Sequence, residues 1–178
     1  MNDPAELWAP RPDAATSTAL GKFSAFCAQR AGRRFDTYDE LWTWSVTDGL
    51  EDCWQAVWDF FGVASTSSFE QVLDDRVMPG ARWFQGARLN YAEHVLRSGI
   101  DRPDDIAVVA LSQSRPRRSL TWRELDAEVR SVRAGLERLG VGRGDRVVAY
   151  MPNIPETIVA FLATASLGAI WASCAPEF

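Results

Sequence analysis

The sequence contains one histidine, His94, and this scarcity excludes several kinds of catalytic site. Without a second histidine there is no histidine relay and no evident metal-binding set, so we expect His94 to be structural or solvent-facing. The three cysteines, Cys27, Cys53 and Cys174, are widely separated, and the lack of a Cys-x-x-Cys pair argues against a zinc or redox motif. No nucleophile elbow occurs either. The residues alone therefore indicate no catalytic constellation.

Basic residues are also outnumbered: 19 Lys and Arg stand against 24 Asp and Glu, which gives a net charge of −5. Binding of nucleic acid needs a clustered basic face, so we expect no nucleic-acid partner. Arg115, Arg117 and Arg118 do lie close together, but they fall in a short proline-containing turn and are interpreted as a solvated loop. The odd number of cysteines and the lack of a signal peptide predict a reducing, cytoplasmic compartment.

One stretch without formal charge, residues 157–176, is nearly long enough to cross a bilayer. Its flanks are Glu156 and Glu177 rather than Lys or Arg, and serine, threonine and glycine interrupt it. A buried helix followed by a buried strand explains this composition better. We therefore expect no membrane span.

The first hundred residues show helical patterns separated by glycines. Apolar residues at helical spacing predict a helix over residues 18–31 and a second over residues 48–61, with Asp48 as the cap of the second. A third helix is expected to begin at Asn90, where Glu93 has the spacing of a reciprocal cap. The tryptophans of the second helix form an apolar face that we expect to pack on a neighbouring domain.

From residue 106 the pattern changes to alternating strands and helices. A capping box at Thr121 and Glu124 predicts one helix, and Pro155 fits the first turn of another. Such alternation implies parallel pairing with right-handed crossovers. The predicted strands are residues 106–111, 147–151 and 169–174, and a turn is expected over residues 115–119.

The glycine-rich residues 140–144 could be taken for a phosphate-binding loop, but the order of elements is wrong. A phosphate loop follows a strand and opens a helix, whereas these glycines follow a helix and open a strand. They are interpreted as a helix C-cap followed by a tight turn.

Several segments resemble one branch of the adenylate-forming ligases. Residues 120–125 (LTWREL) and 140–147 (GVGRGDRV) are similar to that superfamily in general. The acetoacetyl-CoA synthetase branch is indicated by residues 44–48 (WSVTD), 54–61 (WQAVWDFF), 78–93 (MPGARWFQGARLNYAE), 150–157 (YMPNIPET) and 166–171 (SLGAIW). Two positions depart from the pattern of the branch: Gln85, where proline is expected, and Glu177, where aspartate is expected.

The resemblance implies an α/β fold and two regions. Residues 1–100 would be the mostly helical N-terminal extension of an acyl-CoA synthetase. Residues 101–178 would be the first βαβαβ part of the AMP-binding domain, with an incomplete parallel sheet. The implied reaction is ligation of acetoacetate to coenzyme A, in which ATP first converts the acid to an acyl-adenylate and coenzyme A then displaces AMP.

The resemblance also implies where the chemistry would lie. The full-length enzymes use ATP, Mg²⁺ and coenzyme A, but their glycine-rich lysine loop, their acidic metal and ribose ligands and their C-terminal lysine have no counterpart before Phe178. We therefore expect no catalytic, cofactor-binding or metal-binding residue in this chain, which would be inactive alone and would meet small-molecule substrates only through further sequence. The residues expected nearest the substrate edge are Cys174, Pro176, Glu177 and Phe178.

Two alternatives remain open from the sequence. The chain could belong to a ligase for another short-chain acid, because the specificity pockets would lie downstream. It could instead be a free-standing interaction module. A free-standing module would leave the apolar side chains of the last strand exposed to water. This exposure is unfavourable, since each large apolar side chain gains roughly 1.5–3 kcal/mol on burial.

Overall fold

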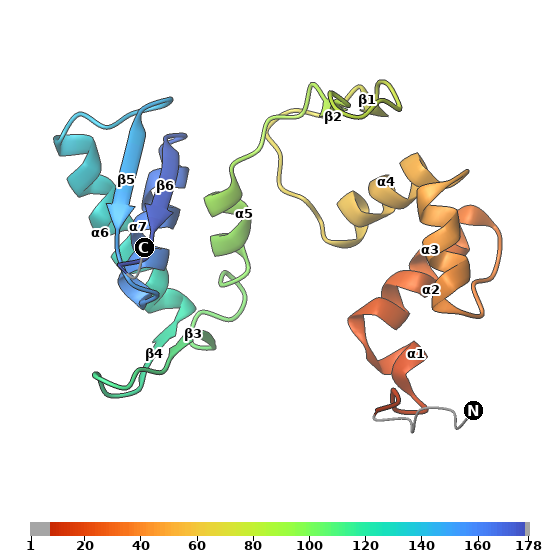
Figure 1. The fold of residues 1–178 in the computed structure, drawn as a ribbon, viewed down its shortest axis with the longest axis horizontal. Coiled ribbons are helices and arrows are strands. Elements are labelled where there is room, and N and C mark those ends of the chain that lie inside the picture. Colours follow the sequence, from red (N-terminus) through yellow and green to blue (C-terminus); the bar gives the residue numbers. More distant parts are fainter. Residues whose placement is uncertain (1–7, 177–178) are drawn as a thin grey trace. The chain divides into compact units, whose positions relative to one another are not determined.

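The structure is a computed structural model that describes residues 8–176, and these residues form two compact units. The first unit contains residues 8–63 and 69–87, and the second contains residues 64–68 and 88–176. Figure 1 shows helices in both units and short strands in each. The predicted boundary between an N-terminal extension and an AMP-binding domain, near residue 100, stays a prediction.

The first unit is mostly helical. Its elements are α1 (Ala14–Ser17), α2 (Ala19–Ala31), α3 (Tyr38–Val46), α4 (Leu50–Phe60), β1 (Gln71–Leu73) and β2 (Trp83–Gln85). The prediction of α2 is confirmed at both ends: the Thr18 side chain accepts a hydrogen bond from the amide of Gly21, and Gly32 ends the helix with a left-handed backbone at φ 63°.

The second predicted helix exists, but its predicted cap is wrong. The N-cap of α4 is Gly49, and Asp48 instead accepts a hydrogen bond from the Thr47 hydroxyl at 3.0 Å. Gly49 packs against the Trp44 ring so closely that an added Cβ would lie 2.0 Å from it. This packing requires glycine at the start of the helix. The elements α1, α3, β1 and β2 were not predicted from the sequence.

The tryptophans of α4 pack against the hairpin of their own unit. Trp54 contacts Trp83 of the β1–β2 hairpin, with 5.4 Å between ring centroids, and Trp58 packs at 4.8 Å against Phe84. Trp54 remains 44% exposed, and the expected packing on a neighbouring domain stays a prediction. The buried core of this unit lies between the helices and contains Cys27, Leu41, Trp44, Cys53 and Ala56.

The second unit carries the strand–helix alternation. Its elements are α5 (Tyr91–Arg97), β3 (Ile106–Ala110), β4 (Arg118–Thr121), α6 (Trp122–Arg138), β5 (Arg146–Tyr150), α7 (Pro155–Ser166) and β6 (Ile170–Cys174). The capping box that opens α6 is confirmed, with Thr121 and Glu124 bonded reciprocally. At Asn90 only half of the expected pair is present among the described contacts: the Asn90 side chain accepts from the Glu93 amide at 3.2 Å.

Parallel pairing is confirmed for β5 and β6, which α7 connects. The strand β3 differs, because it pairs antiparallel with β4, which occupies part of the segment predicted as a turn. The buried Leu120 explains the pairing, since it places an apolar side chain of β4 in the core beside α6 and α7. β4 is too short for its alternation to be recognised in the sequence.

The core of the second unit lies between α6 and α7. Leu125 and Val129 of α6 pack with Val159 and Leu162 of α7, and each is at most 3% exposed. Figure 1 shows α6 and α7 behind the same face of β5 and β6. The opposite face of these strands is uncovered by the described residues and presents Val148, Tyr150 and Ile170, which are 76%, 63% and 52% exposed.

Two further expectations concern the second unit. The charge-free stretch forms most of the 12-residue helix α7 and the strand β6, as predicted, but β6 is not buried: four of its five residues are exposed among the described residues. Among residues 8–176 no helix is both long and apolar enough to cross a membrane. His94 has a structural role, because its Nδ1 accepts a hydrogen bond from the amide of Ala64 at 3.3 Å.

The carboxyl edge of strands β5 and β6 as candidate functional site

The strands β5 and β6 end side by side. In their parallel register Tyr150 is paired with Cys174, so both carboxyl ends lie at one edge of the sheet. Beyond that pair the amide of Met151 donates to the carbonyl of Cys174 at 3.2 Å. The hydroxyl of Tyr150 donates to the carbonyl of Pro176 at 2.8 Å. The segment that leaves β6 is therefore bound to β5 through Tyr150, and the first residue after β5 is bound to the last residue of β6.

The helix α7 begins at the same edge, because it follows β5 directly. Pro155 occupies its first turn, as predicted, and the Thr157 hydroxyl donates to the carbonyl of Pro152 at 2.7 Å. Glu156 also lies in the first turn, where a carboxylate is favoured by the helix dipole. The conformation of the loop from β5 into α7 is thus set by local residues, namely Pro155 and the bond from Thr157 to Pro152.

Two arginines brace the start of α7. Arg115 and Arg118 reach the Glu156 carboxylate at 3.4 Å and 3.3 Å, and Arg118 also pairs with Glu128 of α6. Both side chains stay 57% and 41% exposed, in line with the expected solvated segment, but Arg118 belongs to the strand β4 and both are ion-paired. All four charges are partly exposed, so each pair contributes at most about 1 kcal/mol. Together the ion pairs of Arg118 link β4 to α6 and α7.

The structure places two of the four predicted edge residues together. Cys174 and Pro176 lie at the carboxyl edge beside Tyr150, and the Cys174 side chain is exposed. Glu177 and Phe178 lie outside the described residues. That these residues approach a substrate stays a prediction. The role of Tyr150 in fixing the edge was not predicted, although its place at the end of a strand could have suggested it.

The described residues of the edge include no metal-binding cluster and no lysine. Within residues 8–176 there is no cluster of three or more His, Cys, Asp or Glu side chains that could hold a metal ion. The only lysine of the sequence, Lys22, belongs to α2 in the other unit. The residues present therefore do not fit a magnesium nucleotide, and no reaction step is assigned to them.

The glycine-rich residues 140–144 have the predicted geometry. The amides of Gly140 and Val141 donate back to Glu137 and Leu136 at 3.0 Å, which closes the C-terminus of α6. The amide of Gly142 donates to the Asp145 carboxylate at 2.8 Å. The amides that a phosphate would need are thus used by the helix end and the turn.

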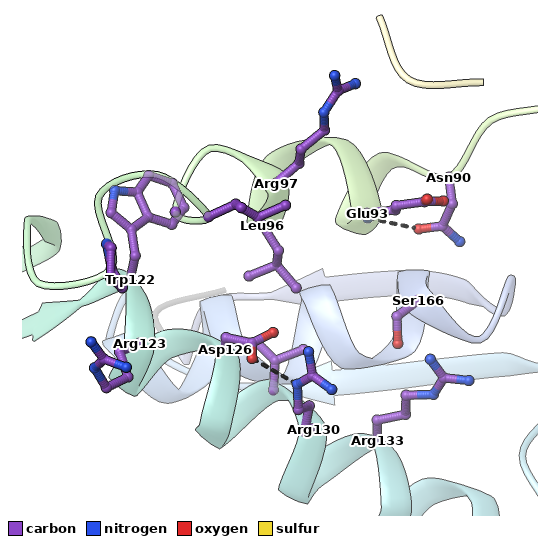
Figure 2. Close-up of a pocket in the computed structure, with 14 residues that line it drawn as sticks. Asn90, Glu93, Leu96, Arg97, Trp122, Arg123, Asp126, Arg130, Arg133 and Ser166 are labelled. Carbon is purple, nitrogen blue, oxygen red and sulfur yellow. Dashed lines mark hydrogen bonds and ion pairs between the residues drawn. The ribbon is translucent and has the colours of Figure 1, made fainter.

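A cleft of about 720 Å³ lies between α5 and α6. Figure 2 shows arginines around it, and those of α6 are matched by carboxylates: Arg130 pairs with Asp126 at 2.6 Å, and Arg133 with Glu137 at 3.4 Å. The Ser166 hydroxyl donates to a backbone carbonyl of α7. Arg130, Arg133 and Ser166 are thus each bonded to other groups of the fold. Residues 123, 126, 130 and 133 are three or four positions apart, so their sequence spacing already places them on one face of a helix.

Comparison with known proteins agrees with the fold. The family model for AMP-binding enzymes matches residues 97–178, and the model for the acetyl-coenzyme A synthetase N-terminus matches residues 38–95. Acetoacetyl-coenzyme A synthetase from Rhizobium meliloti is 40% identical over 97% of this chain and 26% of its own length. Malonamoyl-CoA synthetase from Penicillium aethiopicum is 34% identical over 96% of this chain and 24% of its length.

A solved structure extends the comparison to three dimensions. The acetoacetyl-CoA synthetase from Streptomyces lividans superimposes with a TM-score of 0.90 and 44% identity, over 98% of this chain and 27% of that structure. The chain thus spans about a quarter of the length of the relatives it matches. By fold and sequence, it is similar to the N-terminal part of the acetoacetyl-CoA synthetases, and parts of it match the models for the acetyl-coenzyme A synthetase N-terminus and for AMP-binding enzymes.

Proposed function

We propose that this chain serves as the N-terminal part of an acetoacetate–CoA ligase. The proposal is supported by similarity over 97% of the chain to an acetoacetyl-coenzyme A synthetase, together with a TM-score of 0.90 to a solved one. In the proposed reaction the acetoacetate carboxylate attacks the α-phosphate of ATP and releases diphosphate. The thiol of coenzyme A then displaces AMP to give the thioester.

Within that reaction the role of these residues is to build a scaffold. ATP, Mg²⁺ and coenzyme A would be held by residues outside this chain, because the described part lacks a metal cluster and has no lysine at the sheet edge. The strands β5 and β6 and the helix α7 fix a carboxyl edge, which is where open α/β sheets place ligands. We expect the edge residues Cys174–Phe178 to border the substrate.

The uncovered face of β5 and β6 supports a role within a larger domain. Parallel sheets are covered on both faces in α/β proteins. Burying a side chain such as Val148 or Ile170 gains roughly 1.5–3 kcal/mol, which the described residues leave unrealised on this face. We therefore expect the 178-residue chain alone to self-associate at high concentration and to lack ligase activity.

The test is a chimeric ligase. Residues 1–178 replace the matching segment of the Streptomyces lividans acetoacetyl-CoA synthetase, and thioester formation from acetoacetate, ATP and coenzyme A is measured. We expect an active chimera, whereas the Streptomyces remainder without an N-terminal segment and residues 1–178 alone should both be inactive. A folded chimera without activity would contradict the proposal. So would thioester formation by the 178-residue chain alone.

One comparison suggests a different acid as the alternative substrate. The similarity to a malonamoyl-CoA synthetase, at 34% identity, is close to that of several acetoacetyl-CoA synthetases at 35%. A ligase for another short-chain 3-carbonyl acid is therefore the alternative. A competition assay decides between the two acids. The full-length protein that contains these residues is given acetoacetate and malonamate together, and the preferred acid is the one with the larger kcat/KM.

We also propose a cytoplasmic location and small-molecule substrates, with no nucleic-acid partner. The net charge of −5 and the three free cysteines support this proposal. Fractionation of cells that express a tagged protein tests the location.

A further inference from the structure

A short segment ahead of the β1–β2 hairpin belongs to the second unit. Residues 64–68 are grouped with residues 88–176, whereas the residues on either side of the segment belong to the first unit. The chain therefore passes from the first unit to the second between Val63 and Ala64. The contacts of the segment decide how firmly this point of the chain is held on the second unit.

Two kinds of acceptor hold the segment. The carbonyl oxygen of Arg88 accepts hydrogen bonds from the Thr66 amide at 2.7 Å and from the Thr66 hydroxyl at 3.1 Å. The amide of Ala64 instead donates to the Nδ1 atom of His94, in α5, at 3.3 Å. Thr66 is thus held by a backbone carbonyl, which does not titrate, whereas Ala64 is held by a side chain that can change its charge.

The bond from Ala64 exists in only one protonation state of His94. An imidazole nitrogen accepts a hydrogen bond only when it carries no proton, so the neutral ring must carry its proton on Nε2. Histidine is the side chain that changes its charge between about pH 5 and 8. In the charged ring both nitrogens are donors, so the Ala64 N–H group would face a second N–H group and the bond is lost.

The charged groups near His94 come mainly from its own helix. Glu93 and Arg97 belong to α5 and line the cleft towards α6, whereas His94 is not among the residues that line it. Arg88 precedes α5, and the segment itself contributes only alanine, serine and threonine. The helix α7, which packs on α5, has Glu156 as its single charged residue, and two arginines are ion-paired with that carboxylate.

We propose that His94 is a pH-sensitive switch that controls the attachment of Ala64 to α5. In the neutral ring Nδ1 holds the Ala64 amide. His94 is only half-buried, so water can deliver a proton to Nδ1. Protonation breaks the hydrogen bond and releases Ala64, while Thr66 stays bound to the Arg88 carbonyl. The switch depends on contacts within the second unit and is independent of the proposed ligase function.

The test follows the exchange of single amides in the 178-residue chain. Exchange is resolved by mass spectrometry at low protein concentration, and each rate is divided by the intrinsic rate at the same pH. Between about pH 8 and about pH 5 we expect the protection of the Ala64 amide to fall roughly three- to tenfold. The amides of Thr66 and of the buried Val129 should keep their protection. Unchanged protection at Ala64 would overturn the proposal, and so would an equal fall at all three amides.

Two variants of His94 separate its role as an acceptor from its charge. In His94→Asn the side-chain oxygen lies about as far from the backbone as Nδ1 and accepts without titrating, so the protection of Ala64 should be retained at both pH values. In His94→Gln the amide group lies at the distance of Nε2, so protection should be low at both. A fall with pH that persists in His94→Asn would overturn the proposal. Because His94 is the only histidine of the chain, the pH dependence of the parent decides the proposal even where a variant folds poorly.

Discussion

The Tyr150 hydroxyl donates a hydrogen bond to the carbonyl oxygen of Pro176 at 2.8 Å, across the carboxyl ends of two parallel strands. Tyr150 is the last residue of β5, and Pro176 lies two residues beyond the end of β6. This bond and that from Met151 to Cys174 give the segment after β6 a fixed start at the edge where the proposed chemistry would take place.

Replacing Tyr150 with phenylalanine should loosen this segment without unfolding the unit. The lost hydrogen bond contributes about 0.5–1 kcal/mol, so we expect the amide of Met151 to exchange about two- to fivefold faster. Amide hydrogen exchange measures the change. Tyr38→Phe, at an exposed tyrosine of α3, is the matched control and should leave the Met151 amide unaffected. Unchanged exchange in Tyr150→Phe would show that the hydroxyl does not hold the segment.

Replacing Asn90 should weaken the attachment of α5. Its side chain accepts from the Glu93 amide at 3.2 Å and donates to the Ala165 carbonyl of α7 at 2.8 Å. We expect Asn90→Ala to cost about 1–3 kcal/mol, because it removes both the cap and the link to α7. Asn90→Asp keeps the cap oxygen but loses the donor, so its cost should be smaller.

Urea unfolding measures both changes at Asn90, and the midpoint should move while the slope stays the same. Asn153→Ala, in the exposed loop before α7, serves as the control and should change stability little. Equal losses for Asn90→Ala and Asn90→Asp would assign the whole effect to the bond with Ala165. No loss in either variant would refute the role of Asn90.

Local signals in the sequence predicted those elements whose ends are set by nearby residues. Thr18 with Gly32 and Thr121 with Glu124 satisfy free backbone groups within a few residues, so α2 and α6 could be recognised directly. The parallel pair β5 and β6 followed from their apolar runs on either side of a proline-started helix. The cap of α4 was wrongly predicted at Asp48, because the close packing of Gly49 on Trp44 is a tertiary effect.

The unpredicted features depend on contacts between distant residues. β4 is four residues long and becomes a strand only by pairing with β3, and the β1–β2 hairpin has strands of three residues. The presence of Cys27 and Cys53 in one buried core depends on the packing of two helices, which spacing in the sequence does not reveal. The Tyr150 bond to Pro176 likewise depends on the parallel register.

The capping box at the start of α6 should make that helix sensitive to acid. Hydrogen bonds from the backbone and side chain of Thr121 hold the pKa of Glu124 below its ordinary value of 4.5. A depressed pKa contributes stability that is present above 4.5 and is lost as the pH falls through the lower value in the folded state. We expect Glu124→Gln to be less stable than the parent above that pH, and the difference to shrink on acidification.

Urea unfolding as a function of pH checks this expectation. Glu137→Gln, at the other end of α6, is the matched control, because Glu137 pairs with Arg133 and takes no part in the capping box. A difference between Glu124→Gln and the parent that stays constant across the acid range would show that Glu124 does not titrate with folding.

The buried thiol of Cys27 should make the first unit sensitive to alkali. Burial, as the largest cause, raises its pKa from 9.0 to about 12, so the folded state holds a proton that the unfolded state releases. The stabilisation is complete below pH 9.0 and should be lost as the pH rises towards about 12, by up to about 4 kcal/mol. Urea unfolding across this range measures the loss. Cys27→Ala should reduce the dependence, with a part retained by Cys53, whose pKa is also raised by burial, whereas Cys174→Ala, at an exposed thiol, should keep it in full. If Cys27→Ala retained the full alkaline dependence, the buried thiol would not be its source.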